Sequence, residues 1–237
     1  MKNSLAWTAL LSVLFAACTI RDKQPVAPPC VREPYDSALR LIRQGEALLK
    51  DGDMVVRTGT ELSSQFIREF NRQDKRYSHA GLVFHRDGHP FVYHIVPEAE
   101  NPEGRLKADS FLRFCNPRRT AGFGIYRFDM TEAEIGSLKQ QVEGWLAKGV
   151  RFDSAFNFNN DELMYCSELV SKGVSRATAG RIAFSSTTPT EKEASFFGKQ
   201  LHLSPAYTRS LKIMAIDNLF LHPHCRSIEH YAFSPQP

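Results

Sequence analysis

One cysteine in the sequence stands where its thiol could act as a nucleophile. Cys166 lies at the start of a helix predicted over residues 164–177, in the run Tyr-Cys-Ser-Glu-Leu-Val. Apolar residues recur three and four positions after Cys166, which puts the thiol at the N-terminal end of the buried face. A helix N-terminus carries free N–H groups and partial positive charge, so we expect a lowered thiol pKa and donors for an oxyanion. The alternative is a buried structural cysteine.

A nucleophilic thiol needs a base, and two histidines are predicted on paired strands. His79 lies in a strand over 78–84 and His94 in a strand over 91–96, with the turn signal Asp87-Gly88 between them. This antiparallel hairpin can place the His94 ring beside His79 and let it orient the first imidazole. Nucleophile, base and orienting group together form a catalytic triad.

Strand alternation predicts the side of the sheet on which His94 lies. Val92 and His94 share one face, and Tyr93 and Ile95 share the other. A histidine next to valines on a buried face needs a partner for its ring nitrogens. His79 is that partner if the hairpin register is right. The alternative is that both histidines are polar members of a half-buried sheet.

Three segments form a pattern that extends beyond these candidates. They are Gly52-Asp53 before a strand, Ser78-His79-Ala80-Gly81, and Tyr165-Cys166-Ser167-Glu168-Leu169-Val170. Together they resemble the NlpC-type papain-like cysteine hydrolases. The histidine precedes the cysteine here, which is the order of the circularly permuted branch, the YiiX/YebB-like and lecithin retinol acyltransferase-like proteins. Phe152-Asp153 and Phe156-Asn157 look like the YiiX group, and the resemblance covers roughly residues 48–175.

The resemblance implies roles for individual residues. Cys166 would be the nucleophile, His79 the general base and His94 the third member, with Glu98 as the alternative for that third role. Tyr165 either directs its hydroxyl toward the oxyanion or packs as an aromatic. The implied chemistry is amide or ester hydrolysis through a thioester, without a metal or other cofactor. The substrate would be a peptidoglycan peptide or a lipid-like acyl compound. A non-catalytic envelope lipoprotein that binds peptide or lipid in the same cleft is the rival.

The elements that must position these residues mix helices and short strands. Helices are predicted over 35–50, 61–71 and 131–148, the last opened by a capping box from Thr131 to Glu134, and further strands over 54–57, 123–128, 212–216 and 226–233. This order predicts an α+β fold with a mainly antiparallel sheet packed against helices. The resemblance makes this a circularly permuted papain-like fold.

The N-terminus predicts export and attachment to a membrane. Residues 1–17 have a basic start and an uncharged apolar stretch, and then Ala16-Ala17-Cys18 resembles the lipobox of bacterial lipoproteins. The resemblance implies lipidation of Cys18, and Thr19 in the next position implies the outer membrane, facing the periplasm. Residues 18–34 contain four prolines and predict an extended tether, and residues 35–237 predict a single hydrolase domain. An ordinary signal peptide with an incidental cysteine is the alternative.

Composition excludes several classes of protein. Hydrophobic residues are 42% and charged residues 24%, which is ordinary globular usage and excludes a disordered chain or a coiled coil. The net charge of +4 is too small and too scattered to predict a nucleic-acid partner. Cys30, Cys115 and Cys225 could include one disulfide in an oxidising periplasm.

Overall fold

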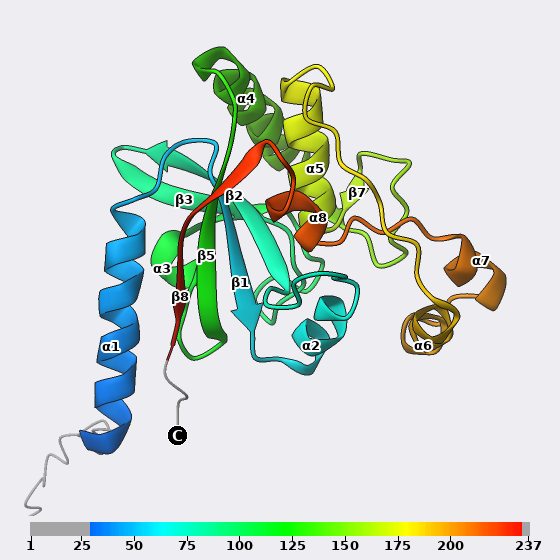
Figure 1. The fold of residues 1–237 in the computed structure, drawn as a ribbon, viewed down its shortest axis with the longest axis horizontal. Helices are drawn as coiled ribbons and strands as arrows, with labels where there is room; N and C mark the ends of the chain where they lie inside the picture. The colour runs from blue at the N-terminus through cyan, green and yellow to red at the C-terminus, as the bar shows by residue number, and fades with distance from the viewer. Residues whose placement is uncertain (1–28, 234–237) are drawn as a thin grey trace, which may run out of the picture.

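A six-stranded antiparallel sheet forms the centre of the molecule, with strand order β4-β3-β2-β1-β5-β8 (Figure 1). The computed structural model describes residues 29–233, with the backbone alone for residues 29–34. The strands are β1 Met54–Gly59, β2 His79–Arg86, β3 His89–His94, β4 Lys107–Ser110, β5 Thr120–Phe128 and β8 Cys225–Ala232, and a separate parallel pair joins β6 Arg151–Phe152 to β7 Leu163–Met164. The predicted α+β class with a mainly antiparallel sheet is confirmed.

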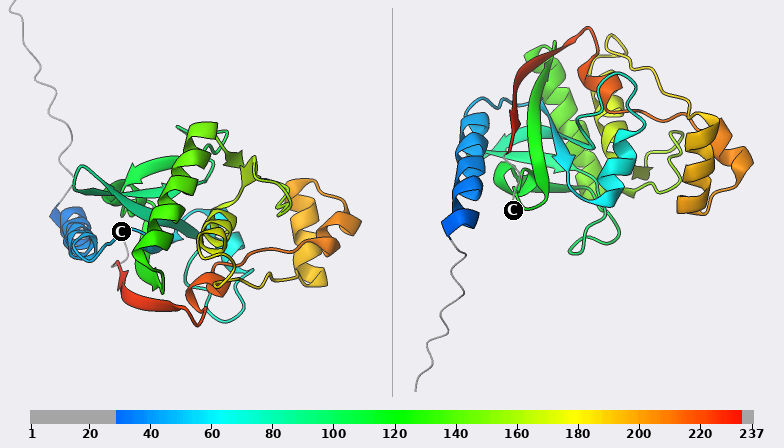
Figure 2. Two further views of the ribbon diagram at one scale, coloured as in Figure 1. Left: turned by 90° about the horizontal axis from the view of Figure 1, so that it is seen from above. Right: turned by 60° about the horizontal axis from the view of Figure 1, so that its bottom comes forward.

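Helices cover both faces of this sheet. They are α1 Pro29–Glu46, α2 Leu62–Arg68, α3 Phe111–Phe114, α4 Glu132–Lys148, α5 Cys166–Ala177, α6 Glu191–Leu201, α7 Pro205–Ser210 and α8 Asp217–Phe220. α4 and α5 lie side by side on one face, whereas α1 and α3 lie on the other (Figures 1 and 2). α6 and α7 project together at the far end from α1 (Figure 1).

The alternation of side chains along the strands produces two hydrophobic cores. Leu82 and Tyr93 face α4 and α5, where they join the core that contains Leu169. Val83 and Val92 face the other way, into the core that contains residues of α1 and α3. Both faces of the sheet are therefore dry, and a polar side chain on either face needs a partner.

The predicted hairpin of β2 and β3 is present. Leu82 pairs with Tyr93 and Val83 with Val92, and the turn places Asp87 at φ 50° and Gly88 at φ 78°. Two successive positive φ angles match the right-handed twist of the flanking strands, which is why an Asp-Gly pair suits this turn.

Two further sequence signals have structural roles. Gly52, at φ 83°, turns the chain into β1, and the buried carboxylate of Asp53 accepts a hydrogen bond of 2.6 Å from Arg127 Nε on β5. The predicted capping box at the start of α4 is present, since Glu134 N donates to Thr131 Oγ1 at 3.2 Å and Thr131 N donates back to the Glu134 carboxylate at 2.7 Å.

The N-terminal boundary differs from the prediction. The tether was expected to run through residue 34, but α1 already begins at Pro29 and ends at Glu46 rather than at residue 50. A proline is accepted as the first residue of a helix because its missing N–H would have no intrahelical partner there. The predicted signal peptide 1–17 and the lipidation site Cys18 lie outside the described residues. Cys115 and Cys225 are free thiols.

The C-terminal third differs more. Residues 212–216 form no strand and make one isolated bridge, between Thr187 and Ile213. The other predicted strand is confirmed as β8, which pairs with β5 at the edge of the sheet. β4 and the helices α6, α7 and α8 were not predicted.

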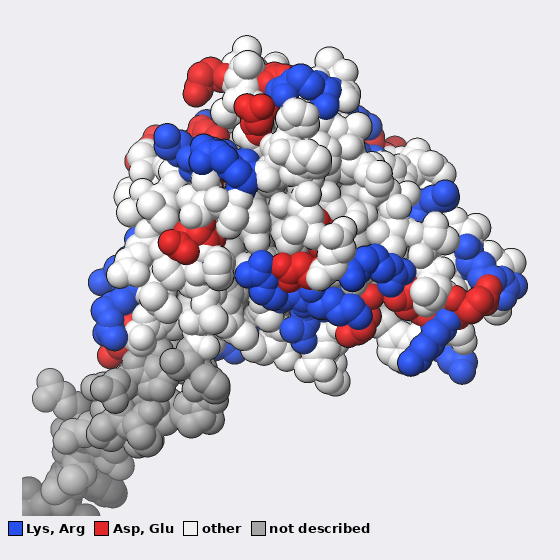
Figure 3. Space-filling view, viewed as in Figure 1, with Lys and Arg blue, Asp and Glu red and all other residues white. Residues whose placement is uncertain are grey.

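On the face in Figure 3, positive and negative side chains alternate around a broad uncharged area. Within residues 29–233 no helix is both long and apolar enough to cross a membrane.

Candidate active site

Cys166 is the first residue of α5, and its side chain is buried at 8% exposure. The helix starts here because Leu163 and Met164 belong to β7 and Tyr165 is still extended. Glu168, one turn into α5, accepts a hydrogen bond from Tyr165 N at 3.3 Å and satisfies a donor at the helix start. The predicted position of the thiol at a helix N-terminus is therefore present.

The predicted pKa shift of this thiol has the wrong sign. Burial raises the pKa of the Cys166 thiol, while backbone N–H groups of Ala80 and Ser167 and the charge of Arg57 lower it. The net shift of the pKa is upward, because removing a thiolate from water destabilises it by more than these donors and the charge of Arg57 stabilise it. Cys166 is thus a neutral thiol that requires a base.

His79 and His94 lie on neighbouring strands and touch through their rings. His79 Nε2 is 2.9 Å from His94 Nδ1, and both side chains are buried, at 5% and 0% exposure. A Cβ on Gly81 would come within 3.1 Å of His94 Cβ, so a glycine at this position leaves room for the second ring. Both rings also pack on Phe114 of α3. The predicted contact and common sheet face of the two histidines are confirmed.

A carboxylate extends this pair. His94 Nε2 is 3.1 Å from Asp109 Oδ2 on β4. The register places Asp109 opposite Val92, on the same face as His94 and diagonal to it, which is within reach of long side chains. Burial raises the pKa of the Asp109 carboxyl, but hydrogen bonds from His94 and Lys107 lower this pKa by more than burial raises it. The carboxylate therefore stays ionised.

The ionised Asp109 fixes the direction of every hydrogen bond in the chain. It only accepts, so His94 Nε2 carries a proton and His94 Nδ1 is an acceptor. His79 Nε2–H then donates to His94, which leaves His79 Nδ1 with a free lone pair. Burial lowers the pKa of His79 well below its ordinary value and that of His94 to about 4, so both rings are neutral near pH 7. His79 Nδ1 is the atom that can take a proton.

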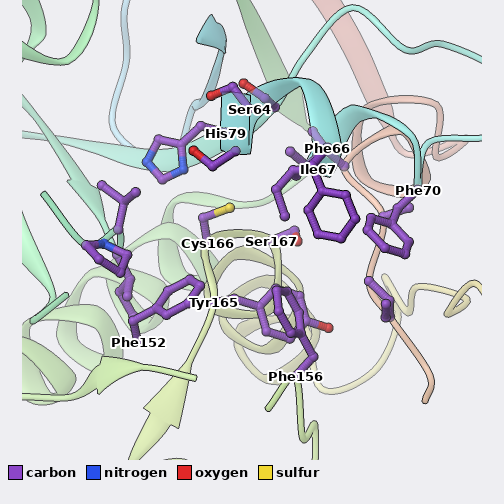
Figure 4. Close-up of a pocket in the computed structure, with 18 of the residues that line it drawn as sticks. Ser64, Phe66, Ile67, Phe70, His79, Phe152, Phe156, Tyr165, Cys166 and Ser167 are labelled. Atoms are coloured by element: carbon purple, nitrogen blue, oxygen red, sulfur yellow. The ribbon is translucent and has the colours of Figure 1, made fainter. Parts of the chain in front are cut away.

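Cys166 and His79 line one pocket from different elements, the start of α5 and the start of β2 (Figure 4). Within residues 29–233, no hydrogen bond joins Cys166 Sγ to the His79 ring, so the direct bond expected from the motif order is not present. Catalytic hydrogen bonds are often long without substrate and tighten when substrate binds.

The pocket has a volume of about 320 Å³ and a mostly apolar lining. Asp153 Oδ1 accepts from Ala155 N at 2.9 Å and turns the loop after β6, and Phe152 and Phe156 on either side of this turn face the pocket (Figure 4). The lining comprises Arg57, Glu61, Ser63, Ser64, Phe66, Ile67, Phe70, Ser78, His79, Ile95, Val96, Pro97, Arg119, Phe152, Phe156, Tyr165, Cys166, Ser167, Leu201, Ile213, Met214, Ala215 and Ile216.

Comparison with solved structures identifies the fold. No family model and no curated protein matches the chain. The crystal structure of YiiX from Escherichia coli O157:H7 matches with a TM-score of 0.63, over 77% of this chain and 98% of that chain. The chain has the fold of YiiX. The sequences are 17% identical, so the likeness is one of fold. YiiX is described as a metalloprotein of the DUF1105 group, and its permuted papain-like fold confirms the predicted fold class.

Within the YiiX fold of this chain, Glu98 forms no hydrogen bond with His79. It follows β3 and forms ion pairs with Lys107, with Arg57 at 3.6 Å and with Arg119 at 3.8 Å. Of the two candidates for the third role, His94 is therefore the one that meets His79. Asp109 was missed, because the short strand Lys-Ala-Asp-Ser has no alternating apolar pattern that would have revealed its pairing.

The residues on either side of Cys166 hold the wall of the pocket. Tyr165 does not direct its hydroxyl to an oxyanion; instead the hydroxyl accepts from Met214 N at 2.9 Å. Ser167 Oγ donates to Met214 O at 2.6 Å. Both polar groups of the Met214 backbone are thus bound by neighbours of the nucleophile, which positions residues 213–216 of the YiiX fold beside the thiol.

Proposed function

We propose that this protein is a cysteine hydrolase that cleaves an amide or ester through a thioester on Cys166. The observation that carries the proposal is the hydrogen-bonded chain from Asp109 through His94 to His79, which ends in the pocket that also contains the thiol. Because Asp109 accepts at one end of the chain, every hydrogen bond in it runs toward Asp109 and His79 Nδ1 is left without a proton, able to act as a base. Two histidines that only stabilise the fold would not need hydrogen bonds that run in this one direction.

The reaction proceeds in two displacements. Sγ attacks the substrate carbonyl carbon while His79 Nδ1 takes the thiol proton, and a C–S bond forms. The backbone N–H groups at the first turn of α5 and at Ala80 are the donors nearest the sulfur, available to the developing oxyanion. The C–N or C–O bond then breaks, and His79 returns its proton to the leaving group. Water, deprotonated by His79, hydrolyses the thioester and restores the thiol.

No step in this mechanism uses a metal. YiiX is described as a metalloprotein, but within residues 29–233 of this chain no three His, Cys, Asp or Glu side chains converge as ligands would. His79 Nε2 and His94 Nδ1 lie 2.9 Å apart, which is the distance of an ordinary hydrogen bond. Among the described residues, the two histidines are thus engaged in a hydrogen bond to each other and are not arranged as metal ligands.

The proposed setting is the bacterial envelope. The apolar segment ending Ala16-Ala17-Cys18 supports a lipid anchor, and acyl chains on Cys18 would hold the hydrolase at the outer membrane on the periplasmic side. The substrates in this setting are a peptidoglycan peptide or a lipid-like acyl compound.

The test is capture of the thioester. Wild-type protein incubated with an acyl p-nitrophenyl ester should gain the mass of one acyl group on the peptide that contains Cys166. The matched control is Cys225→Ala, which removes another free thiol and should still be acylated, whereas Cys166→Ala should not. Release of p-nitrophenol without a Cys166 adduct, and unchanged in Cys166→Ala, would contradict the proposal. Binding of ligand without turnover would favour a non-catalytic binding protein.

A further inference from the structure

One buried cation borders the pocket beside the proposed base. Arg57 lies on β1 directly opposite His79 on β2, and side chains paired in this way lie on one face of the sheet with Cβ atoms about 4.5–5.5 Å apart. The Arg57 side chain is 7% exposed, and it lines the pocket together with His79 and Cys166. A positive charge is therefore fixed next to the histidine, where bulk water screens it little.

The partners of Arg57 neutralise its charge only in part. Its Nη1 donates to the uncharged Phe114 carbonyl at 2.8 Å, and its Nη2 lies 3.6 Å from Glu98 Oε1, beyond hydrogen-bond distance. The same oxygen lies 3.8 Å from Arg119, and Lys107 binds the other oxygen of Glu98. Among the described residues, the buried Arg57 Nε has no hydrogen-bond partner. An arginine that only stabilises the fold would be expected to use its donors fully.

The charge of Arg57 acts on both reacting groups. It disfavours a second positive charge on His79, whose pKa is lowered first by burial and next by Arg57. It favours negative charge on Cys166, whose pKa is raised by burial and lowered by backbone N–H groups and by Arg57. His94 and Lys107 act on His79 in the same direction as Arg57, and more weakly. The other titratable and charged groups around this cluster are Glu61, Glu98, Asp109, Cys115 and Arg119.

We infer that Arg57 is a positioning residue that acts through His79: its charge keeps the imidazole neutral and makes the imidazolium a better proton donor when it forms. This rests on the proposed hydrolase function. After Sγ has attacked, the proton on His79 Nδ1 moves to the leaving nitrogen or oxygen while the C–N or C–O bond breaks, and His79 becomes neutral again. Arg57 favours this transfer because it removes a second positive charge from the site. Leaving groups that cannot depart without a proton, amines above all, therefore depend on Arg57 most.

The first experiment observes His79 without turnover. Its ring signals, identified by their loss in His79→Gln, are followed by NMR against pH in the wild type, Arg57→Met and Arg57→Lys. In Arg57→Met, His79 should take up its proton at a higher pH, whereas Arg57→Lys keeps the charge without the planar guanidinium and should restore the wild-type curve. Arg119→Met is the matched control, since Arg119 lines the same pocket near the same Glu98 oxygen but is 41% exposed, and it should leave the curve in place.

The second experiment follows the thiol. The pH dependence of Cys166 alkylation by iodoacetamide should move to higher pH in Arg57→Met and not in Arg57→Lys, because the thiolate loses a nearby positive charge only in the first variant. Urea unfolding gives the stability of each variant, and a merely structural Arg57 would lower stability without moving either curve. Arg57→Gln, which keeps an amide donor toward Phe114, replaces Arg57→Met if that variant does not fold.

The third experiment compares leaving groups, with the p-nitrophenyl ester and the p-nitroanilide of one acyl group as substrates. p-Nitrophenolate departs without a proton and p-nitroaniline needs one, so Arg57→Met should lower the anilide-to-ester ratio of kcat/KM about tenfold, and Arg57→Lys should retain the ratio.

The outcomes separate this inference from the proposed function. If the wild type forms the thioester but Arg57→Met changes neither the His79 titration nor the Cys166 alkylation, the hydrolase stands and the role of Arg57 is wrong. A shift in alkylation without one at His79 would also overturn the inference, because Arg57 would then act on the thiol alone, and so would an unchanged anilide-to-ester ratio. If both curves shift but the wild type forms no thioester, the electrostatic role of Arg57 stands and the hydrolase is wrong.

Discussion

His79 Nε2 lies 2.9 Å from His94 Nδ1, on the neighbouring strand. Since His94 Nε2 donates to the ionised Asp109 at 3.1 Å, His94 Nδ1 must accept the hydrogen bond from His79 Nε2–H. This order of hydrogen bonds sets the tautomer of His79, so that its Nδ1 carries no proton and can act as an acceptor.

His94 should be needed as a hydrogen-bond acceptor rather than for its charge. Asn in its place can accept from His79 Nε2 and should retain most activity, whereas His94→Ala should lose about 10² in kcat, as is usual for a positioned acid–base group. Circular dichroism checks that each variant folds. Glu98→Gln is the control and should stay active; a dead Glu98→Gln with a fully active His94→Ala would assign the third role to Glu98.

Asp109 should act as a positioning residue through His94. Asp109→Asn removes the charge and lets an amide donate to His94 Nε2, which reverses the ring tautomers, so kcat should fall by about 10² to 10⁴. The pH–rate profile should shift as well, which loss of stability alone would not cause. Arg113→Ala is the control, because Arg113 is 3.3 Å from Asp109 but 56% exposed. An unchanged profile in Asp109→Asn would refute the role.

The Cys166 thiol should react slowly with iodoacetamide near neutral pH. Burial raises its pKa above the ordinary value of 9.0, so the thiolate fraction, and with it the alkylation rate, should still be rising at pH 9. Peptide mass spectrometry over pH 6–10 measures the rate for Cys166 alone. A plateau reached below pH 8 would show an activated thiolate and would mean that the helix N-terminus outweighs burial.

Ser167 and Tyr165 should stabilise the pocket wall through Met214. Ser167→Ala leaves the Met214 carbonyl without its buried donor, and Tyr165→Phe leaves the Met214 N–H without its acceptor, so each should lower the free energy of unfolding by about 1–3 kcal/mol. The double variant should be non-additive, because both bonds hold one residue. Urea unfolding measures all three. Ser210→Ala, at an exposed site, is the control and should change stability by less than about 0.5 kcal/mol.

Cys18 should be the acylated N-terminus of the mature protein. Cells that express the wild type and are fed an alkyne fatty acid should label the protein, and Cys18→Ser should not be labelled. Cys30→Ser serves as the control and should label like the wild type. Equal labelling of Cys18→Ser would leave an ordinary signal peptide as the explanation.

Local patterns in the sequence determined much of the site. Alternation along β3 placed His94 on its face, the Asp-Gly turn fixed the hairpin register, and the apolar spacing after Cys166 put the thiol at a helix start. Each of these signals depends on neighbours in the chain, and steric and hydrophobic rules act the same way wherever such a segment lies.

Only the tertiary structure decided what depends on distant segments. Asp109 reaches His94 through the pairing of a four-residue strand that has no pattern of its own. The sign of the Cys166 pKa shift follows from burial by elements far away in the sequence, which outweighs the local helix N-terminus. The pocket beside Cys166 forms where α2, the loop after β6 and residues 213–216 converge. Burial and cross-strand contact are sums over the whole fold, and no single stretch of sequence contains them.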